Sequence, residues 1–226
     1  MQIIGKGGFG REVAAYCDAS NLSIFQFENE CNGLAWTRDA VIAIGNEEIR
    51  EKIVEKFNLQ SWGRLLFGKN YSDCLIQEGC IICPHTILTV NVKLGRHCIV
   101  NINCTIGHDV HIGDFVTINP GANVSGNVSI GANCNIGSNA VIRNGVTICD
   151  DVVIGAGSVV VKDITEPGIY VGSPATCLDK RPKYVTNKEV DAIVSKLPVV
   201  ENLIKTTNEL VAWSANQDSL MRKLKS

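Results

Sequence analysis

Apolar residues recur with a fixed spacing of six along the middle of the chain. From Ile76 to Val160 every sixth residue is Ile, Leu or Val, fifteen positions in all, and the residues four places after each are small or β-branched. An α-helix repeats at 3.6 and a strand at 2, so a period of six predicts three short strands joined by tight corners in each 18-residue coil. Residues 76 to 165 are therefore predicted to form a parallel β-helix of five coils, a prism about 24 Å tall.

Glycine and asparagine follow many of the aliphatic positions. These residues tolerate positive φ more readily than others. We therefore expect positive-φ corner conformations at Gly107, Gly113, Asn119, Gly131, Gly137 and Gly155.

The segment 1–68 has a different pattern, that of a small α/β unit. Short apolar runs predict strands, and amphipathic stretches predict helices. Asn46 is placed as the N-cap of the second helix. The expected elements are strands at 2–4, 22–27 and 41–45 and helices at 11–17 and 46–57.

The six-residue rhythm ends at VGSPA, residues 171–175. Thr186 to Glu189 has the pattern of a capping box, which opens a helix. We expect three domains, an α/β module at 1–68, a β-helix at 76–178 and a helical extension at 182–226. The extension has no function that its residues indicate.

Charge and cysteine content limit the classes of partner. The 226 residues carry a formal net charge of −2 without a basic stripe, which argues against nucleic acid and anionic membranes. No apolar run approaches the roughly 20 residues that span a bilayer. Ten cysteines occur without a signal-peptide pattern, so we expect reduced thiols and a cytoplasmic protein.

One cysteine pair has a spacing found in metal sites. Cys80 and Cys83 form a CxxC pair with His85 nearby. No second ligand pair follows at zinc spacing, so no metal is expected.

The four histidines, at 85, 97, 108 and 111, all lie in the repeat. Histidine is the natural general base near neutral pH. His108 is followed directly by Asp109, whose carboxylate is able to fix the imidazole tautomer and raise its basicity. Gly126 follows one full coil later, so the next coil offers no side chain beside His108 and leaves room for a slender ligand.

Four segments together resemble a known family. They are IIGKGGFGREVAAY (3–16), IAIGNEEIR (42–50), residues 101–131, and GAGSVVVKDITEPGIYVGSPA (155–175). The chain, over about 1–178, resembles the hexapeptide-repeat sugar acetyltransferases, which include the nucleotide-linked 4-amino-sugar N-acetyltransferases of the bacillosamine and perosamine type and the sialic acid O-acetyltransferases.

The resemblance implies a left-handed β-helix, a homotrimer, and active sites between neighbouring subunits that use acetyl-CoA. His108 matches the family's base, Asp109 matches its acidic partner, and Asn101 matches an Asn near the reacting centre. The acetyl-CoA channel is matched by Gly126, Ser138 and Ala156, and Thr117 stands where bacillosamine enzymes have a second His that touches the cofactor.

A glycine-rich loop lies between the first strand and helix. Backbone amides of Gly5, Gly7 and Gly8 at a helix N-terminus suit a phosphate. The α/β unit is too short for a full dinucleotide-binding fold. By resemblance, Gly7, Gly8 and Phe9 contact the nucleotide sugar, and Gly45 and Asn46 close the site. For the family's acidic pair that reads the nucleotide, the chain offers only Glu28.

The expected function is acetyl transfer from acetyl-CoA to the amino group of a nucleotide-linked 4-amino-4-deoxy sugar, for bacterial surface glycan synthesis. Which nucleotide the sugar carries is left open by the residues. Three alternatives stay open: O-acetylation of sialic acid or a related sugar, a zinc β-helix of the carbonic-anhydrase type with histidines that converge across subunits, and a non-enzymatic assembly scaffold.

Overall fold

The computed structural model describes residues 2–5, 7–17, 23–25, 40–57, 62–70 and 73–179. Glu28 and the expected helical extension at 182–226 lie outside these ranges. Within the described part, no helix is both long enough and apolar enough to cross a membrane.

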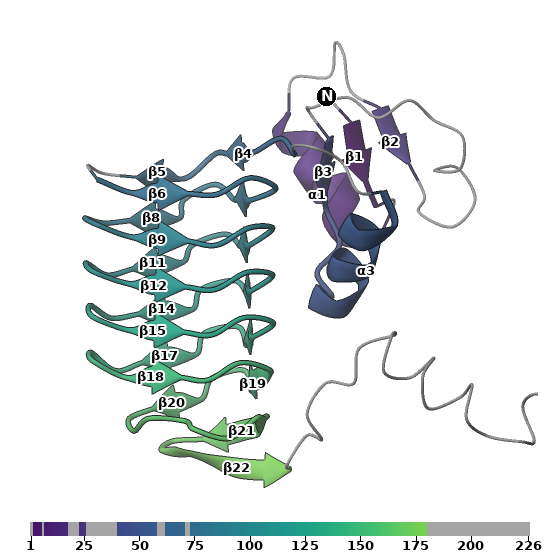
Figure 1. Cartoon of the computed structure of the whole chain (residues 1–226). Helices are drawn as coiled ribbons and strands as arrows, with labels where there is room; N and C mark the ends of the chain where they lie inside the picture. Colours follow the sequence, from purple (N-terminus) through teal and green to yellow (C-terminus); the bar gives the residue numbers. More distant parts are fainter. Residues whose placement is uncertain are drawn as a thin grey trace, which may run out of the picture. The chain divides into compact units, whose positions relative to one another are not determined.

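Each of the fifteen hexads contributes one short strand, and its aliphatic residue is the last residue of that strand and is buried (Figure 1). The predicted parallel β-helix is confirmed. The strands are β6 (Leu75–Ile76), β7 (Ile81–Ile82), β8 (Ile87–Leu88), β9 (Lys93–Leu94), β10 (Ile99–Val100), β11 (Thr105–Ile106), β12 (His111–Ile112), β13 (Thr117–Ile118), β14 (Asn123–Val124), β15 (Ser129–Ile130), β16 (Asn135–Ile136), β17 (Val141–Ile142), β18 (Thr147–Ile148), β19 (Val152–Ile154) and β20 (Val159–Val160).

The strands stack in parallel into three faces of a prism, and each strand pairs with its equivalent one coil away, as Val100 does with Ile118. Face 1 contains β7, β10, β13, β16 and β19, face 2 contains β8, β11, β14, β17 and β20, and face 3 contains β6, β9, β12, β15 and β18. Two further strands, β4 (Leu65–Leu66) and β5 (Lys69–Asn70), pair with β7 and β8. The prism therefore starts before the first recognisable hexad.

The far end of the prism is closed by an antiparallel hairpin. Strand β21 (Gly168–Gly172) continues face 1 beside β19, and β22 (Ala175–Asp179) returns along it. The VGSPA segment supplies the turn, with a cis peptide bond between Ser173 and Pro174. The last strand of the six-residue repeat is β20, so the rhythm has already ended when the five-residue β21 enters this segment.

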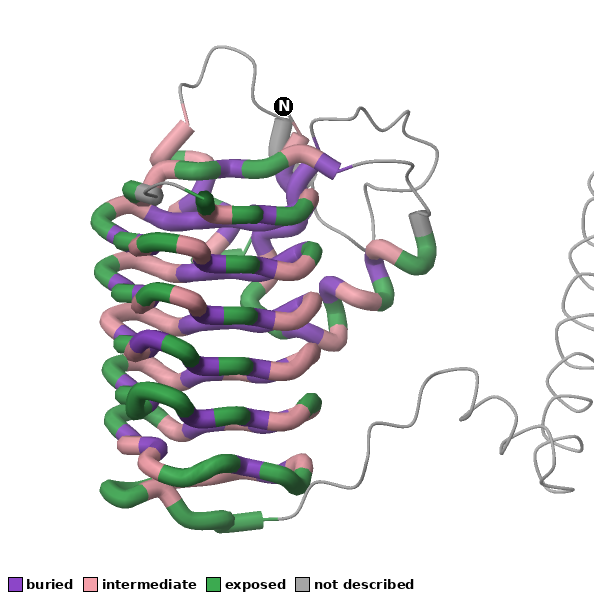
Figure 2. The backbone as a smooth tube through the Cα atoms, turned by 60° about the vertical axis from the view of Figure 1, so that its left-hand side comes forward, coloured by how far each residue is buried: buried purple, intermediate pink, exposed green. Residues whose placement is uncertain are grey.

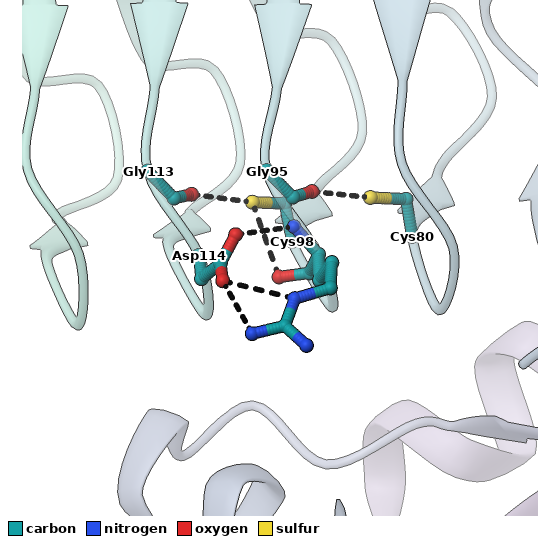
Figure 3. Close-up of polar contacts among 6 residues, drawn as sticks. Cys80, Gly95, Cys98, Gly113 and Asp114 are labelled. Atoms are coloured by element: carbon teal, nitrogen blue, oxygen red, sulfur yellow. Dashed lines mark hydrogen bonds and ion pairs between the residues drawn. The ribbon is translucent and has the colours of Figure 1, made fainter. Parts of the chain in front are cut away.

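Both periodic sets fill the interior, so buried positions recur along every coil (Figure 2). Interior thiols lie between coils and find acceptors there. The Sγ atoms of Cys80 and Cys98 donate to the carbonyl oxygens of Gly95 and Gly113, each at 3.0 Å (Figure 3). Burial raises the pKa of the interior Cys134 thiol to about 12, so it stays protonated.

The corners differ from the sequence expectation. Positive φ occurs three residues after every aliphatic position from Ile76 to Ile154, at Asp109 and Asn127 among others, and not one residue after it. Gly107 is required for a different reason, because an added Cβ would lie 2.5 Å from the Gly126 nitrogen of the next coil. The same close approach holds at Gly137, where a Cβ would lie 2.5 Å from the Ala156 nitrogen.

The N-terminal residues form a three-stranded parallel sheet with the order β2-β1-β3. Helix α1 begins at Gly8 and not at the expected Arg11. Asn46 caps α3 as predicted, since its Oδ1 accepts from the Ile49 N–H at 2.8 Å. The elements are β1 (Gln2–Ile4), α1 (Gly8–Tyr16), β2 (Ser23–Phe25), β3 (Ala40–Ile42) and α3 (Glu47–Phe57).

This N-terminal unit packs on face 1 of the prism. Ile3, Val13 and Val41 share one buried cluster with Ile81 and Ile99, which point outward from face 1. Full burial of a side chain of this size contributes about 1.5–3 kcal/mol. The contact between the unit and the β-helix is therefore an apolar core in its own right.

Candidate functional site

His108 lies at the corner that connects β11 on face 2 to β12 on face 3. Its Nδ1 is 2.8 Å from Asp109 Oδ2, and Asp109 Oδ1 accepts from Asn91 Nδ2 at 2.7 Å. Since an ionised carboxylate only accepts, Nδ1 carries the imidazole proton and Nε2 keeps its lone pair. The His108 side chain is 59% exposed, so a ligand can reach Nε2.

The Asp109 carboxylate is held in its ionised form. Hydrogen bonds from Asn91, and then from His108, lower the pKa of Asp109 below its ordinary value. Asn91 was missed by the sequence analysis. It occupies the position equivalent to Asp109 on the preceding coil, on the opposite side from Gly126, and that coil spacing is a signal by which the sequence could have identified it.

Gly126 lies beneath the His108 ring on the next coil. A Cβ added at Gly126 would be 2.5 Å from His108 Nε2, so the absence of a side chain is a geometric requirement. The Gly126 carbonyl accepts from Gly145 N at 3.0 Å and from Asn144 Nδ2 at 2.7 Å. These bonds fix the peptide on which the imidazole rests.

The other three histidines have different surroundings. His111 is exposed, and its Nδ1 is 3.3 Å from the backbone oxygen of Asp109. His85 is exposed as well. His97 is buried, and burial, followed by the charges of Arg50 and Arg96, lowers its pKa to about 4. Of the four histidines, only His108 forms an ion pair with a carboxylate of the described residues.

An open groove of about 400 Å³ runs along face 3. His111, Lys93 and Thr147 line it, whereas His108 does not. The general-base candidate therefore lies beside this groove and outside it.

The glycine loop of the N-terminal unit lies at the carboxyl end of β1. Strand β1 has β2 on one side and β3 on the other, so the strand order reverses at β1. Ligands of open α/β sheets bind at such a switch point. Gly10 allows α1 to approach the sheet, since a Cβ there would be 1.7 Å from the Gly5 oxygen. An added Cβ at Gly7 or Gly8 would meet nothing within 4 Å, so their backbone is open to a ligand.

The turn after β3 connects this switch point to face 1. The Thr117 hydroxyl donates to the Gly45 oxygen at 3.0 Å. Glu47, buried in the first turn of α3, accepts from Asn135 Nδ2 at 3.2 Å. Asn135 Oδ1 in turn accepts from Asn119 Nδ2 at 2.7 Å. Thr117, expected at the cofactor, thus contacts the turn that was expected at the sugar.

The predicted site residues fall into three groups within one chain. The first lies on the N-terminal unit and face 1: Gly5, Gly7, Gly8, Gly45, Asn46 and Thr117. The second, with His108, Asp109 and Gly126, lies at the corner between faces 2 and 3. Asn101, Ser138 and Ala156 form the third, at the corner between faces 1 and 2. A single chain therefore does not bring the base together with the sugar loop.

Phe9 has a more structural environment than expected. It is half-buried and packs into the apolar cluster between the N-terminal unit and face 1. Its contact with a nucleotide sugar stays a prediction.

The CxxC pair is not arranged as a metal site. Cys80 belongs to the prism interior, whereas Cys83 points outward into the cluster under the N-terminal unit. Across the described ranges, no group of three or more His, Cys, Asp or Glu side chains is placed to hold a metal ion.

Comparisons with known proteins give similarity over different lengths. Residues 127–162 match the family model described as the hexapeptide repeat of succinyl-transferase. A GDP-perosamine N-acetyltransferase from Escherichia coli O157:H7 is 34% identical over 78 residues. That alignment spans 33% of this chain and 35% of the relative, about a third of its length.

Solved structures match over more of the chain. The acetyltransferase domain of PglB from Neisseria gonorrhoeae FA1090 is 28% identical with a TM-score of 0.72, over 78% of this chain and 98% of that one. The same domain in complex with acetyl coenzyme A gives a TM-score of 0.70. WeeI from Acinetobacter baumannii AYE is also 28% identical over the same shares, with a TM-score of 0.63. With its unbroken repeat, the chain is similar in fold to these acetyltransferase structures and, over a third of its length, similar in sequence to a GDP-perosamine N-acetyltransferase.

Proposed function

We propose that this protein transfers the acetyl group of acetyl-CoA to the amino group of a nucleotide-linked amino sugar, such as a 4-amino-4-deoxy sugar. The observation that carries the proposal is the His108–Asp109 pair above the bare Gly126 peptide. An amine nitrogen must lose a proton as it attacks a thioester, and this pair supplies a base with a free, accessible Nε2 to accept that proton.

The chemistry follows from the orientation of the ring. The sugar amine attacks the thioester carbonyl carbon while His108 Nε2 accepts the proton from the amine nitrogen. Asp109 accepts the hydrogen bond from Nδ1 and stabilises the imidazolium that forms. The backbone N–H of Gly126 is proposed as a donor to the developing oxyanion. The C–S bond then breaks, and the CoA thiolate leaves and takes up a proton.

The sugar is proposed to bind at the switch point of the N-terminal unit. The open amides of Gly7 and Gly8 at the start of α1 suit the negative charge of a diphosphate. Gly5 shapes the loop, and Gly45 and Asn46 bound the site on the β3 side. Phe9, Glu28 and Asn101 stay proposed contacts of the nucleotide or the sugar.

The separation of the base from the sugar loop supports an active site shared between subunits. We propose a homotrimer of left-handed β-helices in which the base corner of one subunit faces the N-terminal unit of its neighbour. Acetyl-CoA would then lie in the groove between two prisms, lined by Gly126, Ser138 and Ala156 from different subunits, whereas buried Thr117, bonded to Gly45, would belong to the sugar side. The domains at 1–68 and 76–178 would act as sugar-binding and transfer modules, for bacterial surface glycan synthesis in the cytoplasm.

The function is tested by incubating the purified protein with acetyl-CoA and UDP-, dTDP- and GDP-linked amino sugars, with thiol release as the readout. We expect one amino sugar to be acetylated, and replacement of His108 by Ala to lower kcat at least about 100-fold. His85→Ala is the matched control, because that exposed corner histidine should leave kcat unchanged. Acetylation of hydroxyl sugars alone, or normal turnover by His108→Ala, would overturn the proposal.

Mixing of inactive chains tests the shared site. Chains that carry His108→Ala and chains that carry Gly8→Trp, which fills the open loop, should each be inactive as homotrimers. Co-refolded mixed trimers should regain activity, because some interfaces combine an intact base corner with an intact sugar loop. Failure to regain activity in trimers of confirmed mixed composition would place both groups in one subunit.

A further inference from the structure

Arg50 of α3 is fully buried, with 0% of its surface exposed. Its guanidinium donates hydrogen bonds to the backbone of the turn after β3. Nη1 donates to the Ile44 oxygen at 2.8 Å and to the Gly45 oxygen at 3.0 Å. The backbone of the turn proposed to bound the sugar site is therefore fixed by one side chain.

The same guanidinium also reaches the prism. Nε donates to the His97 oxygen at 3.1 Å, and Nη2 donates to the Phe115 oxygen at 2.7 Å. These two residues are one coil apart, so they occupy equivalent corners of successive coils between face 3 and face 1. Arg50 thus connects the turn to two coils at once.

The corner that Arg50 contacts is rigidly packed. The His97 ring stacks on Phe115 with centroids 5.2 Å apart and an interplanar angle of 7°. Trp62 contacts His97 edge-on, with ring centroids 5.1 Å apart. Since both carbonyls belong to the backbone of these stacked residues, their positions are set by the packing.

Attachment of the N-terminal unit to the prism does not by itself require the buried Arg50. The N-terminal unit already packs on face 1 through an apolar cluster, and a buried cation is costly unless its hydrogen bonds are satisfied. No carboxylate pairs with Arg50 in the described part of the chain, and burial lowers its pKa to about 10, so it stays charged at neutral pH. The guanidinium instead fixes geometry, because its planar, rigid set of N–H donors holds four carbonyl oxygens in fixed positions relative to one another.

We infer that Arg50 is a positioning residue, which sets the height of the Gly45–Asn46 turn on the β-helix and thereby the place of the nucleotide sugar along the prism. This inference rests on the proposed function and names a residue that tunes it. Two neighbouring contacts act in the same direction, Thr117 to Gly45 and Asn135 to Glu47, one coil apart along face 1.

The test is Arg50→Lys in the full-length protein, with kcat and both KM values measured. Lysine keeps the positive charge but lacks the planar set of guanidinium donors, so the Gly45–Asn46 turn should lose its fixed position along the prism. We expect the KM for the nucleotide sugar to rise at least tenfold and the KM for acetyl-CoA to stay within twofold. Arg64→Lys is the matched control. Arg64 donates to the Ile76 oxygen of the prism at 2.7 Å without touching the turn, so both KM values should be unchanged.

A second variant keeps the test valid if Arg50→Lys does not fold. Thr117→Val removes one hydrogen bond to the Gly45 oxygen at nearly constant volume, and should raise the sugar KM about threefold without a change in melting temperature. An unchanged sugar KM in an active, folded Arg50→Lys, or in Thr117→Val where Arg50→Lys does not fold, would overturn the inference, as would equal increases in both KM values. Wild-type protein without transfer to any sugar would instead refute the proposed function, so the two failures are distinguishable.

Discussion

Replacement of Gly126 by Ala is expected to disable the base without unfolding the protein. The added Cβ would lie 2.5 Å from His108 Nε2, whereas ordinary contacts of this kind begin at 3.4 Å. The ring must therefore move by about 0.9 Å or rotate away. Because the His108 side chain is 59% exposed, it can do so at an off-rotamer cost of about 0.5–1.5 kcal/mol.

A displacement of about 1 Å in a reacting group can lower the rate about 100-fold. We therefore expect kcat in Gly126→Ala to fall about 100-fold, while the melting temperature stays close to that of the wild type. Thiol release and thermal unfolding measure the two quantities. His108→Ala with Gly126→Ala should be no slower than His108→Ala alone, since both changes act on the same group.

Asn144→Ala is the matched control for Gly126→Ala. It removes the side-chain hydrogen bond to the Gly126 carbonyl but adds nothing beneath the ring, and Gly145 N still donates there. Its kcat should stay within threefold of the wild type. The reasoning is refuted if folded Gly126→Ala turns over within threefold of the wild type, or if Asn144→Ala is as slow as Gly126→Ala.

Three further predictions concern pH, the acidic partner and the thiols. The pKa of His97 is about 4 in the folded protein against 6.5 in the unfolded chain. The neutral ring therefore contributes its full stabilisation above pH 6.5, and this stabilisation is lost as pH falls toward 4. Denaturant titrations should show that the free energy of unfolding falls by about 3 kcal/mol across this window, and that this fall is absent in His97→Phe. Asp109→Asn should lower kcat at least about tenfold with little change in the free energy of unfolding, because the carboxylate that fixes the His108 tautomer is exposed; an unchanged kcat would remove Asp109 from the mechanism. In the native protein, iodoacetamide at pH 8 should modify exposed Cys177 and leave Cys134 unmodified, as read by peptide mass spectrometry; equal labelling would contradict the buried, protonated state of Cys134.

The β-helix was predictable because its signal is local and repeated. Every aliphatic position from Ile76 to Val160 is buried, and each adds independent support to the same period. The Asn46 cap was predictable for the same reason, since capping depends on residues within one turn. The His108–Asp109 contact followed from adjacency in the sequence.

The features that the sequence analysis missed depend on which coils and elements are neighbours. The positive-φ corners were not recognised because several of them carry large residues, such as His97 and Phe115, whereas the glycines used as the signal are close-approach positions. Asn91 required the 18-residue register to be applied to polar residues as well as to apolar ones. The contacts of Arg50 with His97 and Phe115 join positions 47 and 65 residues apart, and no pattern within α3 indicates them.

The 18-residue register also limits how this chain can change in length. Removal of one residue between Ile112 and Ile118 would shift every later side chain by one place, so interior aliphatics would point outward and corner residues inward. Loss of a whole 18-residue coil leaves each face continuous and only shortens the prism by one strand spacing, about 4.8 Å. The distance between His108 and the far end of the prism can therefore change only in steps of one whole coil.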